Sequence, residues 1–195
     1  MGAGMNVRRL VQLAVLAAIS VVLVYFIHFP LFPAAPFLIY DPADIPLILA
    51  TFLFGPVSGL VLTLVTCVVQ EAAFPQSGIV GIIMHFCATG SYCLLAGYIF
   101  GRKRDMAGAV VAMLAGICAM TLLMIALNLV VTPLFMSVPV KAVADMILPV
   151  LLPFNLIKAG VNSVLAFVVF KSVGKFLMRM AGERSNPGNN PERRE

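Results

Sequence analysis

The sequence has no tryptophan, only two histidines and few charged residues. Charged residues make up 11% of its 195 positions, whereas a soluble domain carries about 25%. Four long stretches contain no Asp, Glu, Lys or Arg at all, namely 10–40, 45–70, 72–101 and 106–140. This scarcity excludes an ordinary soluble globular domain.

The motifs of common enzyme classes are also missing. There is no P-loop, no nucleophile elbow and no His-Glu zinc helix. No cofactor or metal site is expected, and the chain has no ATPase domain, so any uphill transport must be powered by other proteins. The four cysteines lie inside apolar segments, which indicates packing residues and not a disulfide framework.

Long apolar segments dominate what is present. Runs of about 20 apolar residues indicate membrane-spanning helices, because a helix satisfies its own backbone hydrogen bonds in hydrocarbon. The sequence therefore predicts an all-α, polytopic membrane protein with a bundle of six transmembrane helices. The expected spans are 10–29, 43–54, 57–73, 78–100, 107–131 and 147–172.

The second and third spans are separated at Gly55-Pro56, because proline breaks a helix interior and Gly-Pro favours a turn. With this break, both termini and the basic cluster 101–105 fall on one side of the membrane. Basic residues flanking spans mark the cytoplasmic side, so the N- and C-termini are predicted to be cytoplasmic. The net charge of +5 therefore reflects membrane topology and not nucleic-acid binding.

We expect one membrane domain, residues 1–181, followed by a tail at 182–195. The tail, "GERSNPGNNPERRE", is polar and rich in Pro, Gly and Asn. Such a composition cannot bury enough apolar surface to fold, so a disordered cytoplasmic end is predicted.

Three polar residues interrupt the last apolar segment. Asn155, Lys158 and Asn162 share one helix face, because they are spaced three and four residues apart. A lysine inside a span costs about 2.5–3.5 kcal/mol on insertion scales, so it usually faces a cavity or a partner. No acidic residue within a span is available to pair it. We interpret the stripe as part of an outward-opening ligand pocket. The alternative is that Lys158 reaches the outer surface while the asparagines join helices.

Two further polar positions are candidates at similar depth. Asn128, near the outer end of the fifth span, fits either a ligand contact or an interhelical hydrogen bond. His85 lies on a small stripe with Gly81 and Thr89, which favours a packed helix contact, and it is retained as a ligand candidate.

The connection at 28–46 contains five prolines yet is strongly apolar. It is predicted to form either an ordered lid over a flat ligand or a loop lying on the membrane. Asp44 is expected to N-cap the second helix. The lid residues that would cover the ligand are Phe37, Leu38, Ile39 and Tyr40.

Several stretches resemble the riboflavin-specific S components of energy-coupling factor (ECF) vitamin transporters. They are "YDPADIPLILATFLFGPVSGLVLTLVTCVVQ", "GIIMHFCATG" and "LLPFNLIKAGVNS". The resemblance extends to about residue 178. It implies a six-helix subunit of the bacterial cell membrane that captures riboflavin on the outer side, with partners comprising a membrane T component and two cytoplasmic ATPases.

The resemblance also implies roles for single residues. Asn128, Asn155 and Lys158 match the family's polar contacts to the flavin ring, and the first outer loop matches its lid. Ala14 and Ala18 match the small-residue motif that contacts the T component. Small residues four apart let helices approach closely, although they also suit packing within the bundle.

Three alternatives stay open on the sequence. The chain could be an S component for another ligand, such as flavin mononucleotide, thiamin or a pantothenate precursor. It could be a lipid-modifying membrane enzyme, which would need an acidic or metal-binding cluster that the spans lack. It could also be an assembly subunit without a ligand.

Overall fold

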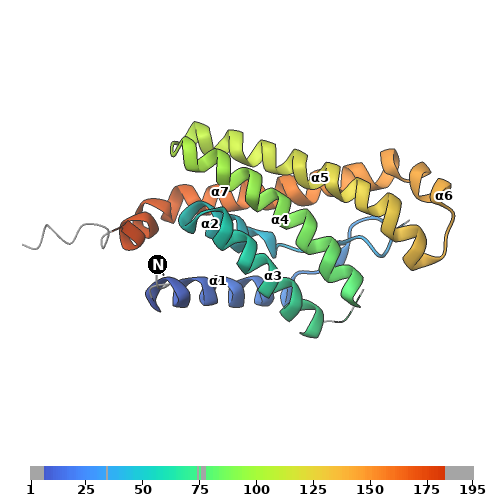
Figure 1. Cartoon of the computed structure of the whole chain (residues 1–195), viewed down its shortest axis with the longest axis horizontal. Helices are drawn as coiled ribbons and strands as arrows, with labels where there is room; N and C mark the ends of the chain where they lie inside the picture. The colour runs from blue at the N-terminus through green and yellow to red at the C-terminus, as the bar shows by residue number, and fades with distance from the viewer. Residues whose placement is uncertain (1–6, 34, 74, 76–77, 183–195) are drawn as a thin grey trace, which may run out of the picture.

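A computed structural model describes residues 7–33, 35–73, 75 and 78–182. Its long helices pack beside one another as a bundle (Figure 1). The helices and strands are α1 (Val7–Phe26), β1 (Phe29–Pro30), β2 (Ile39–Tyr40), α2 (Asp44–Phe54), α3 (Pro56–Ala73), α4 (Gly78–Arg102), α5 (Met106–Met136), α6 (Val140–Asp145), a π-helical segment η1 (Ile147–Leu151) and α7 (Leu152–Gly182). The predicted tail beyond Gly182 lies outside the described residues.

Five of the described helices are long and apolar enough to cross a membrane, and they correspond to the first and the third to sixth predicted spans. The second predicted span is α2, which has only 11 residues. At 1.5 Å per residue it is about 16 Å long, roughly half the thickness of a bilayer core. Figure 1 shows α2 in the half of the bundle that also holds the start of α1 and the end of α7.

The break between α2 and α3 falls where the sequence predicts it. Gly55 has a backbone φ of 93°, a conformation that suits glycine, and Pro56 is the first residue of α3. Asp44, in contrast, is not the N-cap of α2. It is the first helical residue, and Ala43 occupies the cap position without a side-chain hydrogen bond. The reason is that the Asp44 carboxylate turns away from its own helix toward α4 and α7.

Several predicted boundaries differ from the observed ones. The first helix ends at Phe26 because Phe29 and Pro30 pair with Tyr40 and Ile39 in a small antiparallel hairpin. This hairpin is an exception to the predicted all-α fold. The fifth span continues to Met136 and contains Pro133, and the sequence analysis missed α6 and η1.

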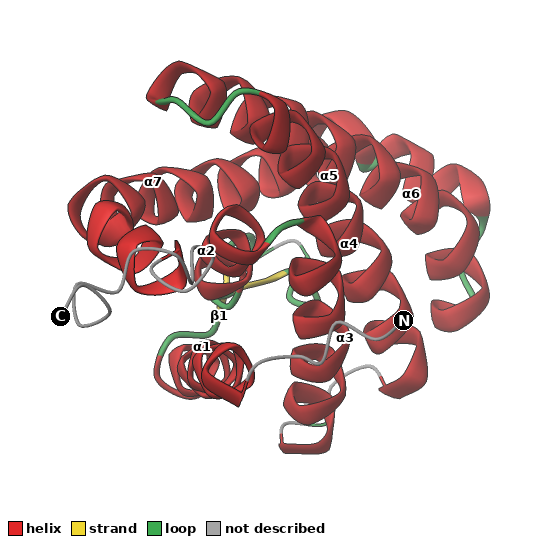
Figure 2. Ribbon diagram, turned by 60° about the vertical axis from the view of Figure 1, so that its left-hand side comes forward, coloured by secondary structure: helices red, strands yellow, loops and turns green. Residues whose placement is uncertain are grey.

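The proline-rich connection is partly buried, with Phe29 46% and Phe37 41% exposed but other residues enclosed by the bundle. Figure 2 shows its two short strands between helices, close to α2. Ala35 and Leu38 are buried in a cluster with residues of α6, η1 and α7. Ser20 of α1 donates a 2.7 Å hydrogen bond to the Ala43 carbonyl, which fixes the end of the connection. The connection is therefore an ordered and partly buried segment, and its role as a lid stays a prediction.

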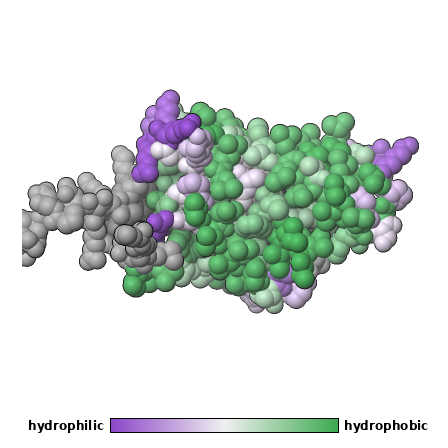
Figure 3. All heavy atoms as spheres, viewed as in Figure 1, coloured by the Kyte–Doolittle hydropathy of each residue, from purple (hydrophilic) through white to green (hydrophobic). Residues whose placement is uncertain are grey.

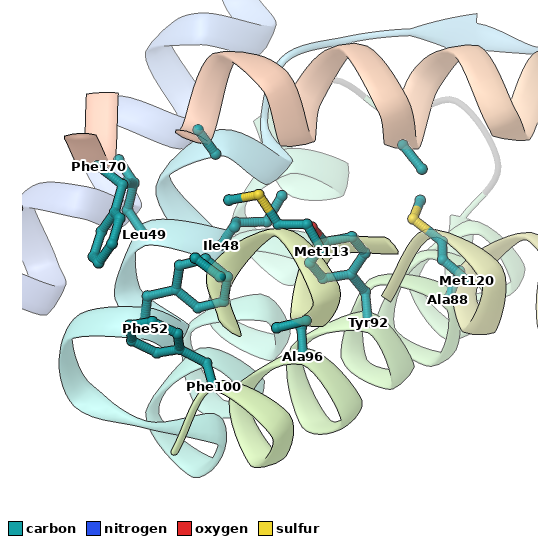
Figure 4. Packing of buried hydrophobic residues seen from close by; sticks show 14 residues of the cluster. Ile48, Leu49, Phe52, Ala88, Tyr92, Ala96, Phe100, Met113, Met120 and Phe170 are labelled. Atoms are coloured by element: carbon teal, nitrogen blue, oxygen red, sulfur yellow. The ribbon is translucent and has the colours of Figure 1, made fainter. Parts of the chain in front are cut away.

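The main core extends from Ala88 and Met120 on the cavity wall toward the end of the bundle that holds the start of α1 and the end of α7 (Figure 1). The rings of Phe52, Phe100 and Phe170 meet there with centroids 4.6–5.5 Å apart (Figure 4). Outside this core, most side chains on the face drawn in Figure 3 are apolar, and hydrophilic residues lie near its two ends and in a small group on its lower edge. This distribution matches a protein surrounded by lipid along its middle.

Close approach between α2 and α3 depends on Gly59. A Cβ at this position would lie 1.9 Å from Thr51 Oγ1 and 3.0 Å from Thr51 Cβ. We therefore expect Gly59→Ala to destabilise the protein by about 1–3 kcal/mol, because overpacking displaces buried neighbours. Thermal unfolding in detergent measures the effect. Gly101→Ala is the matched control, since a Cβ there would meet nothing within 4 Å. Equal midpoints for the two variants would contradict the tight contact.

Candidate functional site

A cavity of about 490 Å³ lies between the hairpin connection and helices α3, α4, α5 and α7. This volume falls within the range of about 300–1,000 Å³ that is typical of small-molecule sites. It is situated toward the end of the bundle that holds the α3–α4 and α5–α6 connections, opposite the chain ends (Figure 1). Seven of the predicted ligand residues line it: Asn128, Asn155, Lys158, His85, Phe37, Leu38 and Ile39.

The polar stripe of α7 divides into two parts. Asn155 and Lys158 line the cavity, so Lys158 does not extend to the outer surface as the alternative interpretation requires. Asn162 is fully buried one turn further along and does not line the cavity. Tyr40 is likewise outside the cavity lining, because its hydroxyl donates to Asn162 Oδ1 at 3.1 Å. These two predicted ligand residues therefore bind each other.

Lys158 has an acidic partner that the sequence analysis did not assign. Its Nζ lies 2.7 Å from Asp41 Oδ2, and both residues have only 9% of their surface exposed. Asp41 comes from the connection before α2 and lies on the cavity wall. An ammonium group has three N–H donors, so Lys158 can hold Asp41 and still donate to a ligand. The lysine is thus a fixed donor and not an isolated cation.

The two asparagines of the cavity are held by their own helices. Asn155 Nδ2 donates to the Leu151 carbonyl at 2.7 Å, and Asn128 Nδ2 donates to the Met124 carbonyl at 2.8 Å. Each carboxamide keeps a second N–H, and its oxygen can accept further bonds. Thr132 donates to Asn128 Oδ1 at 2.9 Å. Asn155 lies in the first turn of α7, just beyond the π-helical segment η1, a distortion that is frequent at functional sites.

A second network lies beneath the cavity and centres on Asp44. This carboxylate, 2% exposed, accepts a hydrogen bond from Thr89 at 2.9 Å and one from Asn162 at 3.2 Å, and it lies 3.3 Å from His85 Nε2. Asn162 also donates to the Asp41 carbonyl at 3.0 Å. The start of α2 is thereby tied to α4 and α7. His85 is a helix contact, as its stripe predicted, and it also lines the cavity.

The rest of the cavity wall is mostly apolar. Four methionines contribute to it, and their flexible side chains adapt to flat ligands. The sequence analysis missed these methionines, as well as Gln70 and Glu71 at the end of α3. The adjacent polar pair at an otherwise apolar helix end was the one available signal for Gln70 and Glu71. The methionines of the wall are Met84, Met120, Met124 and Met136.

The two small residues of α1 lie elsewhere. Ala14 and Ala18 are exposed on the outer face of the helix and do not line the cavity. Among the described residues, no group of three or more His, Cys, Asp or Glu side chains could hold a metal ion.

Comparison with known proteins identifies relatives along most of the chain. Residues 8–170 match the family model of the substrate-specific component of ECF transporters. The chain is 32% identical to the riboflavin transporter RibU of Staphylococcus aureus over 151 residues, 74% of this chain and 79% of the relative. It is 32% identical to the riboflavin transporter FmnP of Bacillus subtilis over 143 residues, 69% of this chain and 75% of the relative.

The fold has a counterpart among solved structures. An S component of a bacterial ECF transporter superimposes with a TM-score of 0.75 at 31% sequence identity, covering 88% of this chain and 98% of that one. Together with the five apolar helices, these relatives make the chain a multi-pass membrane protein.

Proposed function

The chain belongs to the family of substrate-specific (S) components of ECF transporters, and on that premise we propose that it captures riboflavin for uptake into the cell. The observation that carries the proposal is the cavity, where Asn128, Asn155 and Lys158 meet in a hollow whose wall is mostly apolar. Flavin chemistry suits such a site, because the ring is flat and apolar over most of its area and polar along one edge.

In our proposal the three side chains bind the pyrimidine edge of the flavin ring. That edge offers two carbonyl groups and an N–H, and an amide side chain can both donate to it and accept from it. Lys158 would donate to a ring carbonyl or nitrogen while Asp41 holds its position. Phe37, Leu38 and Ile39 would cover the apolar part of the ring as a lid. Tyr40 and Asn162 would anchor the lid through their mutual hydrogen bond.

Uptake also requires partners, which we infer from the family. The S component would dock through α1 on a membrane T component, where the exposed Ala14 and Ala18 allow close helix contact. Two cytoplasmic ATPases would supply the energy, since this chain would act as a binding subunit without enzymatic activity or a cofactor of its own. We place both termini in the cytoplasm, and we count the short helix α2 as a span, which brings the total to six.

Flavin binding by the purified protein tests the proposal. We expect the detergent-solubilised chain to bind riboflavin at submicromolar concentration with quenching of flavin fluorescence. A panel containing thiamin and pantothenate is the control. Binding of another vitamin in preference to riboflavin would support the alternative S component, and binding of none would contradict ligand capture altogether.

A further inference from the structure

Ser20 is a buried serine of α1 whose hydroxyl group bonds to another part of the chain. Serines inside helices often donate back to a carbonyl of their own helix, as Ser91 and Ser172 do here at 2.7 and 2.9 Å. Ser20, with none of its surface exposed, donates instead to the carbonyl of Ala43, 23 positions along the chain. Its hydroxyl group therefore joins α1 to the residue just before α2.

The segment that Ser20 holds is short and stiff. Ala43 donates its backbone N–H to Asp41 Oδ1 at 3.1 Å, so the aspartate side chain is bonded to the residue two positions later. Pro42 lies between them, and a proline ring fixes its own φ and restricts the residue before it. A restraint on the Ala43 carbonyl therefore also restrains the Asp41 carboxylate.

Asp41 extends this restraint to the cavity. Its second carboxylate oxygen, Oδ2, accepts a 2.7 Å hydrogen bond from Lys158 Nζ. A continuous chain of hydrogen bonds thus runs from Ser20 through Ala43 and Asp41 to Lys158, although Ser20 itself does not line the cavity.

The 41–43 segment is held from two different helices. Lys158 and Asn162, which donates to the Asp41 carbonyl at 3.0 Å, both belong to α7. Ser20 belongs to α1, and α1 and α7 each pack on α2. The bonds from α7 alone would let the segment follow the lysine, whereas the bond from α1 gives it a second, independent attachment.

We propose that Ser20 is a positioning residue of the ligand site, which holds the 41–43 segment so that Asp41 orients Lys158 before the ligand enters. This inference rests on the proposed riboflavin-binding function. Without the Ser20 hydroxyl, the free protein would hold the segment in the binding geometry for only part of the time. The apparent affinity would fall by that fraction.

Riboflavin titration of Ser20→Ala tests the inference. The affinity should fall by about three- to tenfold, because the net value of one hydrogen bond limits the loss. Ser91→Ala is the matched control, since it removes a hydroxyl that also donates at 2.7 Å but within its own helix. It should change the affinity by less than about twofold. Ser20→Cys keeps a weak donor and should lose less affinity than Ser20→Ala, so the test does not depend on the folding of one variant.

A double-mutant cycle separates positioning from a general loss of stability. In the Asp41→Asn/Lys158→Met background the ion pair is absent, so Ser20 has no lysine to orient. Adding Ser20→Ala to this background should change the riboflavin affinity by less than about twofold. A general weakening of the bundle would instead lower the affinity by the same factor in both backgrounds.

Hydrogen exchange of the ligand-free protein gives a second readout. The backbone amides of residues 43–45 should exchange faster in Ser20→Ala than in wild type or Ser91→Ala, because the segment opens more often. Wild-type affinity in Ser20→Ala, the same loss in both backgrounds, or unchanged exchange at 43–45 would overturn the inference while leaving riboflavin capture intact. Failure of wild type to bind riboflavin would instead contradict the proposed function, and the inference with it.

Discussion

Lys158→Met weakens riboflavin binding by about 10- to 100-fold in our expectation, which corresponds to about 1.4–2.8 kcal/mol. Methionine preserves much of the side-chain length but removes the donor and the charge. A ligand acceptor left unpaired in a water-excluded site costs about 1–3 kcal/mol. Fluorescence titration with riboflavin measures the change directly.

The ion pair with Asp41 allows the ligand contact to be separated from a structural effect. Removing one partner of a buried pair leaves an uncompensated charge, which costs about 3–5 kcal/mol in stability. In Lys158→Met alone, the Asp41 carboxylate is left without its cation. The double variant Asp41→Asn/Lys158→Met has no unpaired charge, so its thermal stability should recover.

Riboflavin affinity should not recover with it, because the donor is still missing. If the double variant regains both stability and affinity, Lys158 acts only by holding the loop. If Lys158→Met binds riboflavin as wild type does, the lysine is not a ligand contact.

Asp44→Ala is expected to have the largest effect on folding. The carboxylate joins α2 to Thr89 and His85 of α4 and to Asn162 of α7, and alanine leaves these buried groups without their acceptor. Each unsatisfied buried group costs about 1–3 kcal/mol. A total of about 3 kcal/mol or more would lower the midpoint of thermal unfolding on the order of 10 °C for a chain of this length.

A thiol-reactive dye can follow this unfolding, because Cys67 and Cys93 are free and buried in the folded protein. Asp44→Asn is the matched variant, since it keeps one acceptor oxygen and should lose less stability than alanine. Removal of the exposed carboxylate in Asp145→Asn should have almost no effect. A midpoint for Asp44→Ala equal to that of wild type would mean that the network does not support the fold.

Parts of the site could be predicted because polar groups are costly in hydrocarbon. Asn128, Asn155 and Lys158 stand out in apolar segments, and the structure brings all three to one cavity. Cavity residues of types that are common at such positions gave no such signal. The cavity methionines look like any packing residue, and Gln70 and Glu71 look like a helix end.

Asn162 and Tyr40 illustrate the limit of sequence reasoning. Helical spacing correctly put Asn162 on the face of Asn155 and Lys158, but spacing cannot tell how deep the cavity reaches. Tyr40 follows the lid residues in sequence, yet it points to a partner 122 positions away. Whether Asn162 and Tyr40 contact a ligand or each other depends on how the connection between α1 and α2 enters the bundle.

The sequence by itself determined that this protein crosses a membrane in helices, where the chain breaks at Gly55-Pro56, and which polar residues had to be shielded from lipid. Those features are local, because each helix forms its own backbone hydrogen bonds and the composition of each apolar run indicates that it lies in lipid. Only the tertiary structure decided that Asp41 and Asp44 supply the charges facing Lys158 and His85. The physical reason is that a non-helical connection has no periodicity to predict its path, and its burial becomes favourable only once distant helices provide hydrogen-bond partners.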